Sequence, residues 1–220
     1  MEAVDGGEAI VTMRQVQREA RAWFTPREPD WAVRQWGYAL MRAGRQRVLD
    51  VGCGSGRHTV FLVELGLSVT AGDVSTLALA ETRRWLAREQ LEATLVQLEM
   101  TALPFQSEAF DAVLSVNVLH PARLEQARAA VGEIWRVLRP GGSFLAVLSG
   151  AGDCHCLLER PAASALAACP HRANEGDLYS LFAHFRILET QRPNLGLSKV
   201  AGPLSWRGIN WRIWAERPAL

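Results

Sequence analysis

Three glycines at alternate positions follow a short apolar run in this chain, and this arrangement restricts the fold strongly. Val48-Leu49-Asp50-Val51 has the apolar, β-branched composition of a buried parallel strand. Gly52, Gly54 and Gly56 follow it directly, and residues 59–65 then carry apolar side chains at helical spacing. Glycines let the backbone turn sharply and let a ligand approach bare main chain. Strand, glycine turn and helix together predict the first half of a nucleotide-binding βαβ unit.

The spacing of the glycines separates two classes of nucleotide-binding turn. A dinucleotide fingerprint that begins at Gly52 needs its third glycine at position 57, where this chain has Arg57. This disfavours a dinucleotide-dependent oxidoreductase. The pattern present is Asp-x-Gly-x-Gly-x-Gly and begins at the acidic Asp50. A packing turn that binds nothing is the alternative, so the downstream residues must decide.

This motif resembles the cofactor loop of the class I S-adenosylmethionine (SAM)-dependent methyltransferases. In that family the loop holds the methionine end of SAM, so the resemblance implies that Gly52, Gly54 and Gly56 bind the cofactor. It also implies that Asp50 lies near a cation, directly or through water. The implied fold is α/β, a doubly wound sheet of seven strands that is mostly parallel, with the last strand antiparallel. The implied product is S-adenosylhomocysteine (SAH).

A second acidic residue, Asp73, ends the next predicted strand, 68–73. This is the place of a carboxylate that binds both ribose hydroxyls of an adenosine. A surface aspartate that caps the helix beginning near Ser75 is the alternative. Val74 would follow as an apolar face for the adenine. The helix predicted from Leu77 to Leu91 is expected to turn Leu77, Ala80, Trp85 and Leu86 toward the sheet.

Two further segments match the family pattern. After a predicted strand at 94–98, Glu99 and Met100 precede Leu103-Pro104-Phe105. The resemblance implies that the Glu99 carboxylate takes the adenine amino group and that the Met100 N–H reaches a ring nitrogen. The run 135–142 resembles a family hallmark and predicts a tight turn at 139–142 into the next strand.

Residues just beyond the strand predicted at 109–117 should face the transferred group, because ligands bind outside the carboxyl ends of parallel strands. The resemblance places Asn117 near the methionine moiety through its backbone carbonyl. His120 is the candidate general base by position and by the usual pKa of histidine. The alternative for His120 is a capping or packing role before Pro121, and His58 is expected to serve local structure.

The chain is expected to form one domain, 1–220, in three parts: N-terminal helices (1–44), a SAM-binding core (45–150), and a C-terminal helix and strands (151–220). The N-terminal helices, one predicted at 8–24 and one with Asp30 as its cap and ending near Met41, carry Trp23, Trp31 and Trp36. They either close over the site as a lid or pack on the sheet.

Composition excludes several classes of function. The net charge of +1 gives no bulk field that favours nucleic acid or a membrane surface. The N-terminus is not of the signal-peptide type, no apolar run could span a bilayer, and four cysteines suggest no disulfide scaffold, so a cytoplasmic location is expected. Clusters at 154–156 and 169–171 lack the paired spacing of zinc ligands, so no metal site is expected.

The resemblance predicts a SAM-dependent methyltransferase. Eight tryptophans and a near-zero charge favour a small, partly apolar acceptor. Because the methyl group of SAM is already electrophilic, alignment and desolvation can carry the transfer. The alternative is a non-catalytic methyltransferase-like module that binds SAM, or no ligand, and serves a partner.

Overall fold

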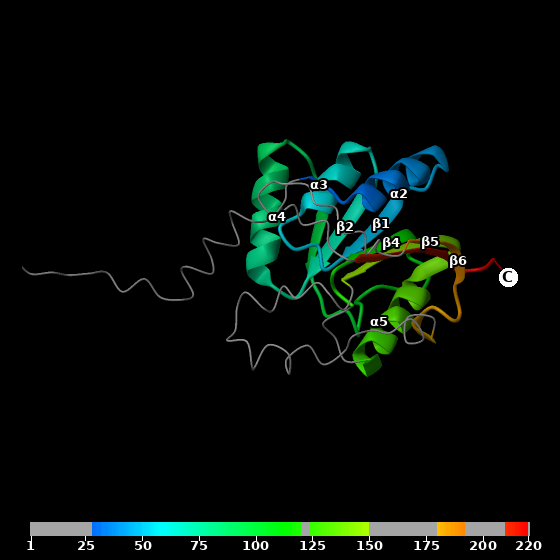
Figure 1. Cartoon of the computed structure of the whole chain (residues 1–220). Helices are drawn as coiled ribbons and strands as arrows, with labels where there is room; N and C mark the ends of the chain where they lie inside the picture. The colour runs from blue at the N-terminus through cyan, green and yellow to red at the C-terminus, as the bar shows by residue number, and fades with distance from the viewer. Residues whose placement is uncertain (1–27, 120–123, 150–179, 192–209, 220) are drawn as a thin grey trace, which may run out of the picture.

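A single sheet of seven strands runs through the computed structural model of the chain, which describes residues 28–119, 124–149, 180–191 and 210–219 (Figure 1). The strands are β1 (Arg47–Val51), β2 (Ser68–Asp73), β3 (Thr94–Gln97), β4 (Phe110–Val116), β5 (Leu138–Ser149), β6 (Arg186–Gln191) and β7 (Asn210–Glu216). Their order is β3-β2-β1-β4-β5-β7-β6. Only β7 runs antiparallel to its neighbours, β5 and β6. The predicted mostly parallel sheet with an antiparallel last strand is confirmed.

Helices cover both faces of this sheet. The described helices are α2 (Trp31–Arg42), α3 (Arg57–Glu64), α4 (Thr76–Arg88) and α5 (Leu124–Val137). Figure 1 shows α2, α3 and α4 on one side of the sheet and α5 on the other. This alternation is the doubly wound arrangement, and it leaves the carboxyl ends of the parallel strands open at one edge.

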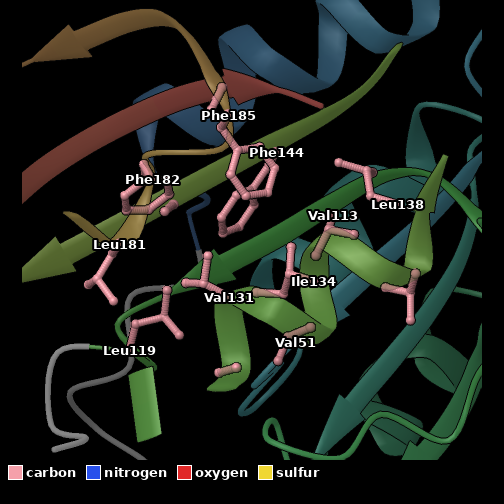
Figure 2. Packing of buried hydrophobic residues seen from close by; sticks show 14 of the residues in the cluster. Val51, Val113, Leu119, Val131, Ile134, Leu138, Phe144, Leu181, Phe182 and Phe185 are labelled. Carbon is pink, nitrogen blue, oxygen red and sulfur yellow. The ribbon is translucent and has the colours of Figure 1, made fainter. Parts of the chain in front are cut away.

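The α5 face holds an aromatic core. Phe144 of β5 stacks on Phe182 with ring centroids 5.5 Å apart and meets Phe185 at 5.4 Å. Figure 2 shows the side chains of Val131 and Ile134 of α5 in the same cluster. Phe144, Phe182 and Ile134 are almost completely buried, so removal of apolar surface from water holds α5 and the 181–185 segment on the sheet.

On the opposite face, α2 is fixed by its first residues and by one tryptophan. Asp30 caps the helix, as predicted, by accepting a hydrogen bond from the Ala32 N–H at 2.8 Å. Trp36 is fully buried, and its indole N–H donates to Ser143 Oγ at 2.8 Å. Trp31 is 53% exposed. Trp36 therefore packs on the sheet, whereas the predicted helix 8–24 with Trp23 lies outside the described residues.

The inward face of α4 differs from the prediction. Leu86 is buried as predicted, but Leu77 is 42% exposed, and the other buried residues are Leu79 and Thr82. Ser75 caps the helix by accepting from the Ala78 N–H at 3.3 Å, which sets where the helix starts and therefore which residues turn inward. The inward face includes a polar residue, Thr82, because that residue contacts the glycine loop.

The predicted tight turn at 139–142 is instead a bulge within β5. Leu138 already pairs with Phe110, and the register resumes only at Ser143, which pairs with Ala112. Gly141 adopts a positive φ of 70°. Backbone groups of the bulge bond to Arg217 just after β7, so the strand continues through the segment instead of starting after it.

Among the helices that the structure describes, none has the length and apolar character to cross a membrane.

Candidate functional site

A cavity of about 340 Å³ lies at the carboxyl ends of the parallel strands β1, β2 and β4. Its walls are Val51, Gly52, Asp73, Val74, Leu98, Glu99, Met100, Val116, Asn117 and Val118. This is the edge at which open parallel sheets bind ligands. The cavity brings together six residues predicted from the sequence: Gly52, Asp73, Val74, Glu99, Met100 and Asn117.

The glycine loop, residues 52–56, begins at the cavity wall with Gly52 and runs into α3. At Gly52, with φ of +73°, an added Cβ would lie 2.2 Å from a methyl carbon of Val118, so no larger residue fits. At Gly54, with φ of +57°, an added Cβ would meet no atom within 4 Å. The main chain at Gly54 therefore faces open space, as a loop that lets a ligand approach its backbone must. Gly56 is the N-cap of α3.

The Asp73 carboxylate braces this loop from β2. Its Oδ2 accepts from the Gly54 N–H at 3.0 Å, and its Oδ1 accepts from the Ser75 N–H at 2.9 Å. The cap of α4 is the side chain of Ser75 itself. Because each carboxylate oxygen offers about two acceptor sites, Asp73 keeps acceptor capacity at the cavity wall.

Two threonines missed by the sequence analysis complete the loop. Thr82 of α4 donates from Oγ1 to the Gly54 carbonyl at 2.9 Å, and Thr59 of α3 donates from Oγ1 to Asp50 Oδ2 at 2.7 Å. Both threonines are fully buried. The sequence signal that could have found them is a hydroxyl residue at an inward position of an amphipathic helix. Such a hydroxyl can bond polar groups of a nearby loop that has no strand partner.

Asp50 does not line the cavity but lies beneath the loop, 1% exposed. Burial raises the pKa of its carboxyl to about 6, although the Thr59 hydrogen bond opposes the shift. The charge of Asp73 adds to the increase. An ionised Asp50 is therefore costly in this position, even though the charge of Arg57 opposes the increase in pKa.

The wall opposite the loop follows β3 and combines an apolar face with a carboxylate. Val74 is 64% exposed, and Gln97 donates from its side-chain amide to the Val74 carbonyl at 3.1 Å. Glu99 is exposed and Met100 half-buried. The Ala102 N–H donates to the Glu99 carbonyl at 3.1 Å and closes a turn at this wall. A flat apolar group would fit against Val74 with its polar edge toward Glu99.

Asn117 ends β4 in the left-handed region, with φ of 59°, and its N–H donates to the Val147 carbonyl at 2.8 Å. The strand therefore stops at the cavity, and the chain turns away over it. His120 lies outside the described residues, so its role as a base stays a prediction. The cysteine and histidine clusters at 154–156 and 169–171 also lie outside them.

The family model of the methyltransferase domain matches residues 48–142, which include all three strands that end at the cavity. Residues 48–142 are a methyltransferase domain. Its sheet order and its glycine loop are those of the class I, Rossmann-like architecture.

Two relatives are similar over part of the chain. The uncharacterized methyltransferase YodH of Bacillus subtilis is 37% identical over 102 residues, which cover 46% of this chain and 42% of the relative. Malonyl-acyl-carrier-protein O-methyltransferase of Enterobacter lignolyticus is 40% identical over 96 residues, which cover 44% of this chain and 36% of the relative. The chain thus spans less than half the length of each of these relatives.

Among solved structures, the fold is similar to that of magnesium protoporphyrin IX methyltransferase from Synechocystis PCC 6803 with bound SAH. The TM-score is 0.66 and the sequence identity 15%, and the match covers 94% of this chain and 96% of the other. At this identity the likeness concerns the fold alone.

A cluster of polar residues joins the start of α2 to α3 and to β7. The Asp30 carboxylate pairs with Arg212 of β7 through two contacts of 3.1 Å, and the Asp30 N–H donates to His58 Nε2 at 3.3 Å. Burial lowers the pKa of His58 to about 3, so the ring is neutral and accepts this bond. His58 has the structural role expected of it.

Proposed function

We propose that this chain is a SAM-dependent methyltransferase that transfers the methyl group of SAM to a small-molecule acceptor. The observation that carries the proposal is the single cavity whose wall contains Gly52 of the glycine loop, Asp73, Val74 and Glu99. A volume of about 340 Å³ lies within the range of small-molecule and cofactor pockets.

Each part of SAM has a counterpart in this cavity. The two ribose hydroxyls would donate to Asp73, whose oxygens have acceptor sites beyond the two backbone bonds. The adenine would lie on Val74, with its amino group toward Glu99 and a ring nitrogen toward the Met100 N–H. The methionine end would lie over the main chain at Gly54, where a Cβ would occupy open space.

The charges at the methionine end also suit this ligand. The ammonium group of SAM would lie toward the Asn117 carbonyl and, directly or through water, toward Asp50. A nearby cation favours the ionised form of Asp50, against the burial that raises its pKa to about 6. The ligand therefore compensates a cost that the protein alone carries.

The chain's own residues supply binding, orientation and exclusion of water, which are the main needs of an in-line methyl transfer. When bound, SAM supplies an electrophilic methyl group on its sulfonium. His120 is proposed as the base for an acceptor that must lose a proton, and the N-terminal helix predicted at 8–24 as the lid that excludes water.

The acceptor is proposed to be a small molecule and not a nucleic acid. The net charge of +1 offers no field for a polyanion. Two similar proteins, by their names, methylate malonyl-acyl-carrier protein and magnesium protoporphyrin IX. A cytoplasmic location stays a prediction.

The test is a calorimetric titration with SAH, and NADH serves as the competing ligand class. Gly54→Ala and Gly66→Ala provide a matched pair, because both positions have a positive φ and neither Cβ would touch the protein. Only the Cβ at Gly54 would enter the proposed cofactor volume. We expect Gly54→Ala to weaken SAH binding by about tenfold or more and Gly66→Ala to bind like wild type. Equal binding by the two variants would contradict the proposal.

The activity itself is tested with SAM carrying a labelled methyl group and a panel of small acceptors. Transfer of label to an acceptor supports the enzyme. SAH binding by wild type without transfer to any acceptor favours the non-catalytic module.

A further inference from the structure

The wall of the cavity that carries Glu99 belongs to no helix or strand, and an ion pair on α5 holds the segment that follows it. The segment 98–109 links β3 to β4. Within it, the Leu103 N–H donates to Glu133 Oε2 at 2.7 Å, and the Leu103 carbonyl accepts from Arg136 Nη2 at 3.0 Å. Arg136 Nη1 also donates to the Phe105 carbonyl at 2.7 Å. Two side chains thus satisfy the backbone groups that a neighbouring strand would otherwise pair.

The two side chains also bind each other at two points. Arg136 Nε donates to Glu133 Oε1 at 2.7 Å, and Arg136 Nη2 donates to Glu133 Oε2 at 2.8 Å. The hydrogen bonds from Arg136 hold the pKa of Glu133 below its usual value, so both groups stay charged. A guanidinium presents five donors in a fixed plane and can serve a carboxylate and two carbonyls together, which an ammonium cannot do.

The position of the cavity wall follows from this arrangement. Leu103 is buried in the core, and the ring of Phe105 meets Phe110 edge-on at 5.0 Å. From Leu103 the chain leads back through the turn between Ala102 and Glu99 to the cavity wall. Fixing the backbone at Leu103 therefore limits where the side chain of Glu99 and the N–H of Met100 can lie.

We propose that Glu133 and Arg136 are positioning residues for recognition of the adenine base. This Glu133–Arg136 clamp holds the segment 99–105 so that Glu99 and Met100 present an acceptor and a donor at the spacing of the purine edge. The inference rests on the proposed function, because it assigns the cavity wall to the adenine of SAM.

A simpler role for the pair is to stabilise α5, since Glu133 and Arg136 are three positions apart on one face of the helix. The exchange variant Glu133→Arg/Arg136→Glu separates the two roles. It keeps an ion pair at the same helical spacing, but it turns a donor toward the Leu103 N–H and an acceptor toward the carbonyls. A helix-stabilising pair survives the exchange, and the clamp does not.

The measurement is the ratio of the dissociation constants for S-inosylhomocysteine and SAH, which differ in the 6-amino group that Glu99 is proposed to bind. We expect wild type to prefer SAH by about tenfold, the value of one hydrogen bond to a charged group. In Arg136→Lys and in the exchange variant this preference should fall to about twofold or less. A general loss of stability would weaken both ligands alike and leave the ratio unchanged.

Arg186→Lys is the matched control. Arg186 of β6 forms an equally short ion pair, 2.7 Å, with Glu216 of β7 at the other side of the sheet, and it should keep the wild-type ratio. Glu133→Gln keeps an acceptor for the Leu103 N–H and should give an intermediate ratio. Thermal melting checks that each variant is folded, and Arg136→Lys, the mildest change of the arginine, decides the test where the exchange variant does not fold.

A wild-type ratio in Arg136→Lys or in a folded exchange variant would overturn the clamp. Equal binding of the two ligands by wild type would also overturn it, while SAH binding itself would leave the proposed function standing. Failure of wild type to bind SAH would overturn both proposals together.

Discussion

Two buried aspartates lie on neighbouring strands near opposite ends, one at the amino-end side of the sheet and one at the carboxyl-end side, and their surroundings differ. Asp111 is near the amino end of β4, and Asp50 is near the carboxyl end of β1. Asp111 is 5% exposed and Asp50 1%. Burial alone raises the pKa of both, so the comparison isolates what the partners contribute.

At the amino edge, Asp111 is surrounded by donors. Its Oδ2 accepts from the Gln46 and Arg47 N–H groups, each at 2.9 Å. Its Oδ1 lies 3.3 Å from the Arg47 guanidinium and 3.1 Å from that of Arg139. Burial raises the pKa of Asp111, but these donors and charges outweigh it and bring the pKa below the usual value.

At the carboxyl ends of the strands, Asp50 has a hydrogen bond from Thr59 and a weak influence from the charge of Arg57, and no salt bridge reaches it from the described residues. The pKa therefore moves up instead of down. Both carboxylate oxygens of Asp111 thus have donors or cations from the protein itself. The Asp50 carboxylate has fewer such partners, and it lies at the carboxyl ends of the strands, where we place the ligand. Four substitutions test this difference, from the largest expected effect to the smallest.

Asp111→Ala should lower the free energy of unfolding by about 3 kcal/mol, because it leaves the Gln46 and Arg47 N–H groups without their acceptor and two arginines without their anion. Urea unfolding measures the loss. SAH binding by the folded variant should stay within about twofold of wild type, since the cavity is at the other edge. A loss below about 1 kcal/mol would mean that the partners of Asp111 stabilise the fold no more than those of Asp50 do.

Asp73→Asn should weaken SAH binding by about tenfold to a hundredfold. The variant loses the charge that faces the ribose. Its amide NH2 must also point at the N–H of either Gly54 or Ser75, because both oxygens of the native carboxylate accept from those groups. Calorimetric titration measures the loss, with Glu81→Gln on the exposed side of α4 as control. Binding like wild type would mean that β2 does not end at the ribose.

Asp50→Asn should raise the free energy of unfolding of the ligand-free protein at neutral and higher pH, whereas Asp111→Ala should lower it. The folded-state pKa of about 6 lies above the usual value, so the folded protein holds this proton more tightly than the unfolded chain. The stability from this group is full below the usual pKa and is lost as the pH rises through about 6. At pH 8 the variant should be more stable than wild type by about 1–3 kcal/mol, and below pH 4 the gain should vanish.

Urea unfolding of wild type and Asp50→Asn across that pH range measures the difference between them, so the titration of other carboxylates cancels. A variant that is less stable than wild type at pH 8 would show that Asp50 is as well partnered as Asp111.

Glu99→Gln should have the smallest effect, about threefold weaker SAH binding, because an amide oxygen still accepts from the adenine amino group. The same titration measures it, with the exposed Glu92→Gln on the connection before β3 as control. A loss larger than that of Asp73→Asn would reverse the ranking and move the main anchor of the cofactor from the ribose to the base.

Much of the fold could be predicted from local patterns. The strand β1, the glycine loop and the cap at Asp30 depend on neighbouring residues, and each lies where the sequence predicted it. The inward face of α4 was wrong at Leu77, because the true face depends on contact between Thr82 and a loop from another part of the chain. The bulge at Gly141 was missed because its backbone partners follow β7, far along the sequence.

The site shows the same difference between local motifs and tertiary contacts. The sequence alone determined which residue types end the strands: glycines, Asp73 and Glu99 belong to short motifs whose spacing carries the information. Only the tertiary structure decided what surrounds them. The hydroxyls of Thr59 and Thr82, the Glu133–Arg136 clamp and the different partners of Asp50 and Asp111 are contacts between distant segments. Burial and hydrogen bonding set the charge and position of a group, and both depend on neighbours that meet only when the chain has folded.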